Sequence, residues 1–174
     1  MSHSSVHIGL VNPKSPDNVG SVMRAAGNYQ VTDIYYTGDR YPRALSFQTR
    51  SLDLSRKVSK DVVVTGTDSL VDVIPAGMKV VCVELAVDAV PLPSFKHPEQ
   101  AFYIFGPEDG SISQDVIDIA DEVVYIPTIG CMNLAATVNV VLYDRLAKQD
   151  LNLASNELVR SSRDRNNRLQ VTKE

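Results

Sequence analysis

The chain of 174 residues has only two cysteines, Cys82 and Cys131, and they form no Cys-x-x-Cys pattern. This scarcity argues against a disulfide scaffold and predicts a reduced, cytoplasmic protein. The three histidines, His3, His7 and His97, show no metal-ligand spacing, so no metal site is expected. No apolar stretch approaches the ~20 residues of a membrane-spanning helix. The N-terminus also lacks the apolar core of a signal peptide, so no membrane partner is expected.

Positive charge is scarce as well, because the sequence has 17 Lys and Arg but 21 Asp and Glu, which gives a net charge of −4. This balance argues against a protein that binds nucleic acid over its whole surface. Any such contact must come from a local cluster, and the segment 39–60 holds six of the 17 basic residues, interleaved with Tyr41 and Phe47. The six are Arg40, Arg43, Arg50, Arg56, Lys57 and Lys60. The alternative is that this segment is an ordinary solvated loop.

Short apolar runs alternate with helical patterns along most of the chain. Strands are expected at 6–11, 31–36, 62–65, 79–85, 101–105 and 122–126, and helices at 17–28, 67–74, 111–121 and 133–148. This alternation predicts one α/β domain over residues 1–154, with a mostly parallel sheet and helices on both faces. The continuous apolar run at 79–85 predicts a central strand. Residues 155–174 are polar and rich in Arg and Asn, which is typical of a flexible tail.

The expected helices begin at residues that cap helix N-termini well. The expected caps are Asp17 or Asn18, Ser111 with Gln114 in a capping box, and Asn133. The last helix has apolar residues at helical spacing and further apolar residues on adjacent faces. Because its apolar surface is wider than one stripe, the pattern predicts that this helix is covered on more than one side.

Three loops that follow expected strands carry the candidate functional residues. Ligands bind at the carboxyl ends of the strands in parallel α/β sheets, so these loops are expected to converge on one site. The loop at 127–133 has little bulk and exposed backbone groups, which suits an adenosine-like ligand held by main-chain hydrogen bonds. No Gly-x-Gly-x-x-Gly follows the first strand, so a Rossmann-type dinucleotide site is disfavoured.

The first of these loops leads into Asn18-Val-Gly-Ser-Val-Met-Arg24. Gly20 and Arg24 share a helix face, so Gly20 leaves room for a ligand beside the guanidinium group. The N-terminus of this helix would favour an anion. A capped helix with a surface arginine explains the same residues equally well.

The second loop, Phe105-Gly-Pro-Glu-Asp-Gly110, follows a buried strand directly. Gly106 allows a ligand to approach the backbone, and Glu108 can reach into the same crevice. A plain Pro-x-Asp-Gly turn is the alternative. In the third loop, Cys131 could be only a small buried apolar residue and Asn133 only a helix cap.

Together the three segments resemble, in order and spacing, the three motifs of the SpoU-type (TrmH-like) RNA 2′-O-ribose methyltransferases of the SPOUT superfamily. Motif one corresponds to Asn18, Gly20 and Arg24, motif two to Gly106 and Glu108, and motif three to Ile126, Pro127 and Asn133. The resemblance covers the chain up to about Lys148. It implies a C-terminal trefoil knot, S-adenosylmethionine (AdoMet) bound in that knot, and a homodimer in which Arg24 acts at the other subunit's site.

The resemblance also implies roles for individual residues. The catalytic group would be Arg24, Asn18, Glu108 and Asn133, and the cofactor contacts Val83, Gly106, Ile126, Cys131, Met132 and Leu134. RNA would contact the basic segment at Arg40, Arg43, Arg50, Arg56 and Lys57. Because a guanidinium group stays protonated, a phosphate clamp is the physically simpler role for Arg24 than a base. Cys131 and Ala135 stand where the family often has serine, so two hydroxyl groups are missing.

The resemblance therefore implies an AdoMet-dependent RNA methyltransferase that modifies a ribose 2′-hydroxyl, with tRNA as the favoured RNA and rRNA as the other possibility. One alternative is a non-catalytic RNA-binding or assembly module that keeps the fold. Another is a small-molecule methyltransferase, which the basic segment 39–60 disfavours.

Overall fold

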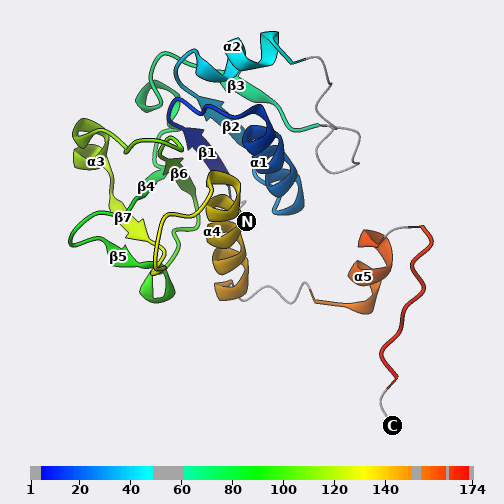
Figure 1. Cartoon of the computed structure of the whole chain (residues 1–174). Coiled ribbons are helices and arrows are strands. Elements are labelled where there is room, and N and C mark those ends of the chain that lie inside the picture. The colour runs from blue at the N-terminus through cyan, green and yellow to red at the C-terminus, as the bar shows by residue number, and fades with distance from the viewer. Residues whose placement is uncertain (1–4, 49–60, 150–153, 164, 173–174) are drawn as a thin grey trace.

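The computed structural model describes residues 5–48, 61–149, 154–163 and 165–172. Among these residues seven strands form one sheet in the order β3-β2-β1-β6-β4-β7-β5, and all neighbouring strands are parallel (Figure 1). The strands are β1 (Val6–Leu10), β2 (Asp33–Tyr36), β3 (Val64–Gly66), β4 (Lys79–Val83), β5 (Val90–Pro91), β6 (Ala101–Phe105) and β7 (Glu122–Tyr125). The predicted parallel α/β fold is confirmed. The sequence did not predict β5, which is only two residues long.

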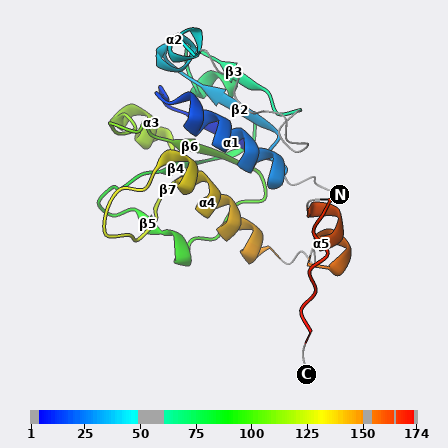
Figure 2. The ribbon, with the colours of Figure 1, turned by 45° about the vertical axis from the view of Figure 1, so that its right-hand side comes forward.

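Helices cover both faces of this sheet. They are α1 (Pro16–Asn28), α2 (Arg40–Ser46), α3 (Gln114–Ile119), α4 (Leu134–Lys148) and α5 (Asn156–Ser162), with 3-10 helices η1 (Val71–Val73) and η2 (Leu92–Ser94). Helices α1 and α4 lie side by side on one face, as the two views in Figures 1 and 2 show. Residues of α3 and η1 pack against the other face. The predicted helix at 67–74 is therefore reduced to a single 3-10 turn.

Strand β6 shows why the sheet is covered on both sides. All five of its residues are buried, and their side chains alternate between the two faces. Tyr103 and Phe105 pack with α1 and α4, whereas Phe102 and Ile104 pack with the α3 side. Its neighbour β4 lies between β6 and β7, which confirms the prediction of a central strand.

The start of α1 differs from the prediction. Ser15 is the N-cap, because its Oγ accepts the amide hydrogen of Asn18 at 3.3 Å, so the prediction of Asp17 or Asn18 is wrong. Pro16 fits the first helical turn, where no amide donor is needed. This arrangement leaves the side chain of Asn18 available for other contacts.

The other two predicted caps have different outcomes. The capping box at Ser111 is wrong, because α3 begins at Gln114 after Ser113 and no side chain bonds its first turn. Asn133 is confirmed as the N-cap of α4, since its Oδ1 accepts the amide hydrogen of Ala136 at 3.1 Å. The last predicted motif is therefore fixed at the start of a long helix.

Helix α5 lies within the segment 155–174, which the sequence predicted as a flexible tail. Ser155 caps this helix by accepting the amide hydrogen of Leu158 at 3.0 Å. The division of the chain at residue 154 and the trefoil knot both stay predictions. In the ranges that the structure describes, none of the helices combines the length and the apolar character needed to cross a membrane.

Candidate functional site

A cavity lies at the carboxyl ends of β4, β6 and β7, where parallel sheets usually bind ligands. Its wall consists of residues that follow these strands and of the first turn of α4. The lining includes all six residues predicted as cofactor contacts: Val83, Gly106, Ile126, Cys131, Met132 and Leu134. The second and third predicted loops line this cavity, and the first is hydrogen-bonded to both of them beside it, whereas the cofactor contacts themselves stay predictions. Cys131 is exposed rather than buried, so its thiol is accessible at the cavity wall.

Sequence reasoning missed several lining residues, of which Glu84 is the most informative. It follows β4 directly, next to the predicted Val83, so its place at a strand end was the available signal. Its Oε1 accepts the amide hydrogen of Leu85 and its Oε2 that of Ile112, each at 2.9 Å. The carboxylate therefore ties the end of β4 to the loop that follows Gly106. The other missed lining residues are Leu85, Phe105, Pro107, Gly110, Tyr125, Thr128, Gly130 and Thr137.

Gly106 is a position at which a side chain would not fit well. A Cβ there would lie 3.1 Å from Oε2 of Glu84 and 3.4 Å from Ile112. Glycine thus keeps this wall open and lets the main chain face the cavity. A cavity with apolar walls and accessible backbone suits a nucleoside cofactor.

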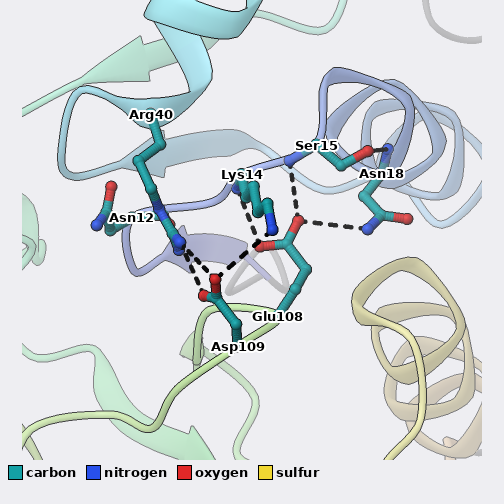
Figure 3. A network of polar contacts seen from close by, with 7 residues as sticks. All are labelled: Asn12, Lys14, Ser15, Asn18, Arg40, Glu108 and Asp109. Atoms are coloured by element: carbon teal, nitrogen blue, oxygen red, sulfur yellow. Dashed lines mark hydrogen bonds and ion pairs between the residues drawn. The ribbon is translucent and has the colours of Figure 1, made fainter.

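Glu108 is held at the edge of the cavity by the segment that opens α1 (Figure 3). Its carboxylate accepts the amide hydrogens of Lys14 at 2.9 Å and Ser15 at 3.1 Å, and the Nδ2 hydrogen of Asn18 at 3.3 Å. Burial alone would raise the pKa of Glu108, but hydrogen bonds from its own main-chain amide and from Ser15, Lys14 and Asn18 outweigh burial, so the pKa is lowered. The side chain is therefore a fixed, charged acceptor at neutral pH.

A further hydrogen bond extends this contact to α4. The Oδ1 of Asn18 accepts a hydrogen from Nδ2 of Asn133 at 2.9 Å. Since Oδ1 of Asn133 caps α4, the three side chains form a continuous relay from the β6 loop to the helix N-terminus. We call Glu108, Asn18 and Asn133 the polar relay. It joins one residue from each of the three predicted motifs.

Arg40 makes a second contact between the first two motif regions (Figure 3). Its Nη1 donates to both carboxylate oxygens of Asp109, at 2.8 and 2.9 Å, and its Nε and Nη2 donate to the Asn12 carbonyl. The hydrogen bond from Arg40 lowers the pKa of Asp109, and Lys14 adds to the effect. The guanidinium group of Arg40 is thus used within the chain. Its predicted RNA contact stays a prediction.

Of the remaining predicted RNA contacts, the structure describes only Arg43, which does not line the cavity. Arg43 lies on α2, exposed, and pairs with Asp39 one turn earlier. Arg50, Arg56 and Lys57 lie outside the described residues.

Arg24 is exposed on α1 and is not among the residues that line the cavity. One copy of the chain therefore does not place this guanidinium group against the cavity wall.

Two further observations limit the chemistry of the site. Cys82 is buried at the centre of the sheet, and burial, with the nearby Glu84 charge, raises the pKa of its thiol to about 12, so it is not a nucleophile. Across the described residues no group of three His, Cys, Asp or Glu side chains could hold a metal ion.

Comparison with known proteins decides the family. The model of the SpoU rRNA Methylase family matches residues 5–143, which include the whole cavity wall and the polar relay. The chain belongs to this family. It is accordingly an AdoMet-dependent RNA methyltransferase, and the sequence-based prediction is confirmed at this level. No curated protein sequence matches the chain significantly.

Solved structures agree with the family's fold. A TrmH/SpoU tRNA modifying enzyme from A. aeolicus has a TM-score of 0.67 at 18% identity, over 83% of this chain and 75% of that chain. A protein described in terms of the 2-OH methylation of C/U34 on tRNA has a TM-score of 0.67 at 22% identity, over 84% and 92%. The SpoU methyltransferase AviRb from Streptomyces viridochromogenes, in complex with AdoMet, has a TM-score of 0.66 at 20% identity, over 84% and 58%.

Proposed function

We propose that this SpoU-family enzyme methylates a ribose 2′-hydroxyl, with tRNA as the favoured RNA, and that it acts as a cytoplasmic homodimer. The observation that carries the proposal is the polar relay, because it fixes Asn18 and Asn133 beside the cofactor cavity without occupying the cavity. Two amide side chains held in this way can orient a hydroxyl and a helix end. A merely structural link would not need to lie at the cavity edge.

The cofactor supplies an electrophilic methyl group, and the chain supplies binding and position. Backbone groups near Gly106, Ile126 and Met132 would hold the nucleoside, since these residues line the cavity and carry no charge. Glu108 would keep Asn18 in place through the 3.3 Å hydrogen bond. Each of these tasks is positional, so the rate enhancement would come from orientation and from exclusion of water.

The outer surface of α4 supports the homodimer. Ala136, Val140, Tyr143 and Ala147 are exposed and lie on one helix face, and the Tyr143 side chain is 62% exposed. The sequence predicts that α4 is packed against other elements on more than one side, whereas within a single chain it is packed on one side. A second copy packed on this face would cover the apolar stripe. It would also lie close to the neighbouring helix α1, which carries Arg24.

Sedimentation can test this assembly. At micromolar concentration the chain should sediment at about twice 19.1 kDa. Tyr143→Glu should yield a folded monomer that still binds AdoMet, because Tyr143 does not line the cavity. A wild-type monomer that methylates RNA would exclude the shared-site arrangement.

tRNA is favoured because two of the structural neighbours act on tRNA by their descriptions. The test is methyl transfer from labelled AdoMet to bulk tRNA and to rRNA, followed by digestion to nucleosides. Label in 2′-O-methyl nucleosides from tRNA is the expected result. Label in a base would refute the ribose assignment, and label only in rRNA would refute the choice of RNA.

The non-catalytic alternative is favoured by one observation, the absence of hydroxyl groups at Cys131 and Ala135. Ala135 is buried, at 8% exposed, whereas Cys131 is exposed at the cavity wall. The same assay separates the two functions. Weak AdoMet binding together with no methyl transfer to any RNA would support the binding module.

A further inference from the structure

Both charged side chains in the cavity wall are acidic. Glu84 and Glu108 line the cavity, and no lysine or arginine is found among its described lining residues. The other lining residues are apolar or small and neutral. The charged side chains of this wall are therefore all negative, and they face a partly open cavity whose lining is both polar and apolar.

The two carboxylates differ in what surrounds them. Glu108 belongs to the polar relay and lies beside the segment with Lys14. Glu84 has no such neighbour, and none of the ion pairs among the described residues includes it. Its two oxygens accept only main-chain amide hydrogens, from Leu85 and Ile112. These two bonds also prevent the carboxylate from turning away into solvent.

A fixed carboxylate without a cation is suited to a positively charged ligand. The surrounding wall screens the charge less than water would, so a cation in the cavity would be attracted strongly. Glu84 also lies next to Gly106, because its Oε2 is 3.1 Å from the position that a Cβ at residue 106 would take. It thus belongs to the same part of the wall as a predicted cofactor contact.

We propose that Glu84 is the residue by which this enzyme distinguishes its cofactor from its product. AdoMet carries a positively charged sulfonium group. On methyl transfer the sulfur–methyl bond breaks, its electron pair stays on sulfur, and the methyl carbon bonds to the RNA oxygen, which releases its proton. The product, S-adenosylhomocysteine (AdoHcy), is therefore neutral at sulfur, and a fixed negative charge favours AdoMet over it. The inference rests on the AdoMet assignment but not on the identity of the RNA.

This preference would help turnover, because the product would lose its attraction to the wall as soon as it forms. Coulomb's law with an effective dielectric constant of about 20 gives a preference on the order of tenfold for one charge at a separation of ~12 Å. The uncharged walls would bind the adenosine portion of both ligands equally. The ratio of the two affinities therefore reports the charge alone.

The test is calorimetric binding of three ligands to the full chain: AdoMet, AdoHcy and sinefungin. Sinefungin carries an ammonium group in place of the methylated sulfonium, so it keeps the positive charge without the transferable methyl. Glu84→Gln should reduce the preference for AdoMet over AdoHcy roughly tenfold, and the preference for sinefungin should fall with it. Glu84→Asp keeps the charge and should retain most of the preference.

Asp88→Asn is the matched control, because it removes the same charge from the same loop between β4 and β5. Asp88 is exposed, does not line the cavity, and has a φ of 65°, which asparagine tolerates. Its affinity ratio should match that of the wild type. If Asp88→Asn changes the ratio as much as Glu84→Gln does, the effect is one of net charge and the proposal is wrong.

Equal weakening of all three ligands by Glu84→Gln would also overturn the proposal, since Glu84 would then only brace the loop. Unchanged binding would overturn it as well. Should Glu84→Gln fail to fold, the wild-type protein gives a second test, because a charge-based preference must fall as salt rises. A preference independent of salt would reject the idea. Failure of the wild type to bind any of the three ligands would instead reject the cofactor assignment.

Discussion

Helix α4 is held at its N-terminus by exposed side chains and at its C-terminus by buried ones. The first contact is the polar relay, in which Asn133 and Glu108 are both exposed to solvent. The second contact joins α4 to the segment 92–103 through His97, Tyr103 and Arg145. Arg145 is 4% exposed and Tyr103 is completely buried.

The buried end is well satisfied by hydrogen bonds. Arg145 donates to the carbonyls of Pro98 and Glu99 and, at 3.1 Å, to the hydroxyl of Tyr103. That hydroxyl lies 2.6 Å from Nδ1 of His97, and Nε2 of His97 lies 2.8 Å from the Asp144 carboxylate. The comparison indicates a division of labour, in which the buried end fixes the helix and the exposed end presents residues to the cavity.

The largest effect on stability is expected from Arg145→Met. The change leaves the Pro98 and Glu99 carbonyls and the buried Tyr103 hydroxyl without the Arg145 donor. We expect a loss of about 3 kcal/mol in the free energy of unfolding, measured by denaturant titration at pH 7. Arg160→Met, on the exposed face of α5, is the matched control and should change it by less than about 0.5 kcal/mol. A loss as small as that of the control would remove the distinction between the two ends.

The largest effect on activity is expected from Arg24→Ala. Arg24 does not line the cavity of its own chain, so AdoMet affinity should not change. Methyl transfer should fall by roughly 10²-fold or more, the scale of a lost positioning group. Arg24→Lys keeps the charge but loses the planar fork, so a phosphate clamp predicts partial activity at best. Full activity in Arg24→Ala would refute the assignment of motif one.

A smaller effect on both properties is expected from Glu108→Gln, which weakens the exposed end alone. The amide cannot accept the Lys14, Ser15 and Asn18 hydrogens together, so Asn18 loses its fixed orientation. Since the site is largely solvated, the stability loss should be about 1 kcal/mol, whereas methyl transfer should fall roughly tenfold. Glu122→Gln, an exposed acid on β7 that does not line the cavity, should alter neither. Comparable losses of stability at Glu108 and Arg145 would contradict the division of labour.

The sequence predicted the exposed end better than the buried one. The apolar runs predicted the bounds of every strand except β5 to within two residues. The motif spacing predicted that Glu108, Asn18 and Asn133 lie at one edge of the sheet. Local patterns contain this information because strands, caps and glycines act over a few residues. The contacts of Arg145 and His97 across to one another's segments were not predicted, since these partners lie 42 to 47 residues apart and resemble ordinary surface residues in sequence. Glu84 was missed for a different reason: its place at a strand end was the available signal, but a single acidic residue there does not form a motif.

The smallest expected effect is on the pH dependence of the stability, which should distinguish the buried end of α4 from the exposed end. Burial lowers the pKa of His97 from 6.5, and it also lowers that of His7. Because the folded state binds these protons less tightly than the unfolded chain does, stability is fully present above about pH 6.5 and falls as the pH drops below it. The hydrogen bonds at Glu108 lower its pKa from 4.5, so its contribution is lost only at more acidic pH.

Unfolding titrations at intervals between pH 7.5 and 4 would measure this difference, with a slope of at most about 1.4 kcal/mol per pH unit for each histidine. His97→Gln should flatten the limb below pH 6.5 partly, with His7 accounting for the rest. Glu108→Gln should leave that limb unchanged and alter only the acidic end. The contacts suit the neutral form of His97, in which Nε2 donates to the Asp144 carboxylate and Nδ1 accepts from the Tyr103 hydroxyl. A wild-type stability that stays constant from pH 7 to 5 would show that the buried end does not keep His97 neutral.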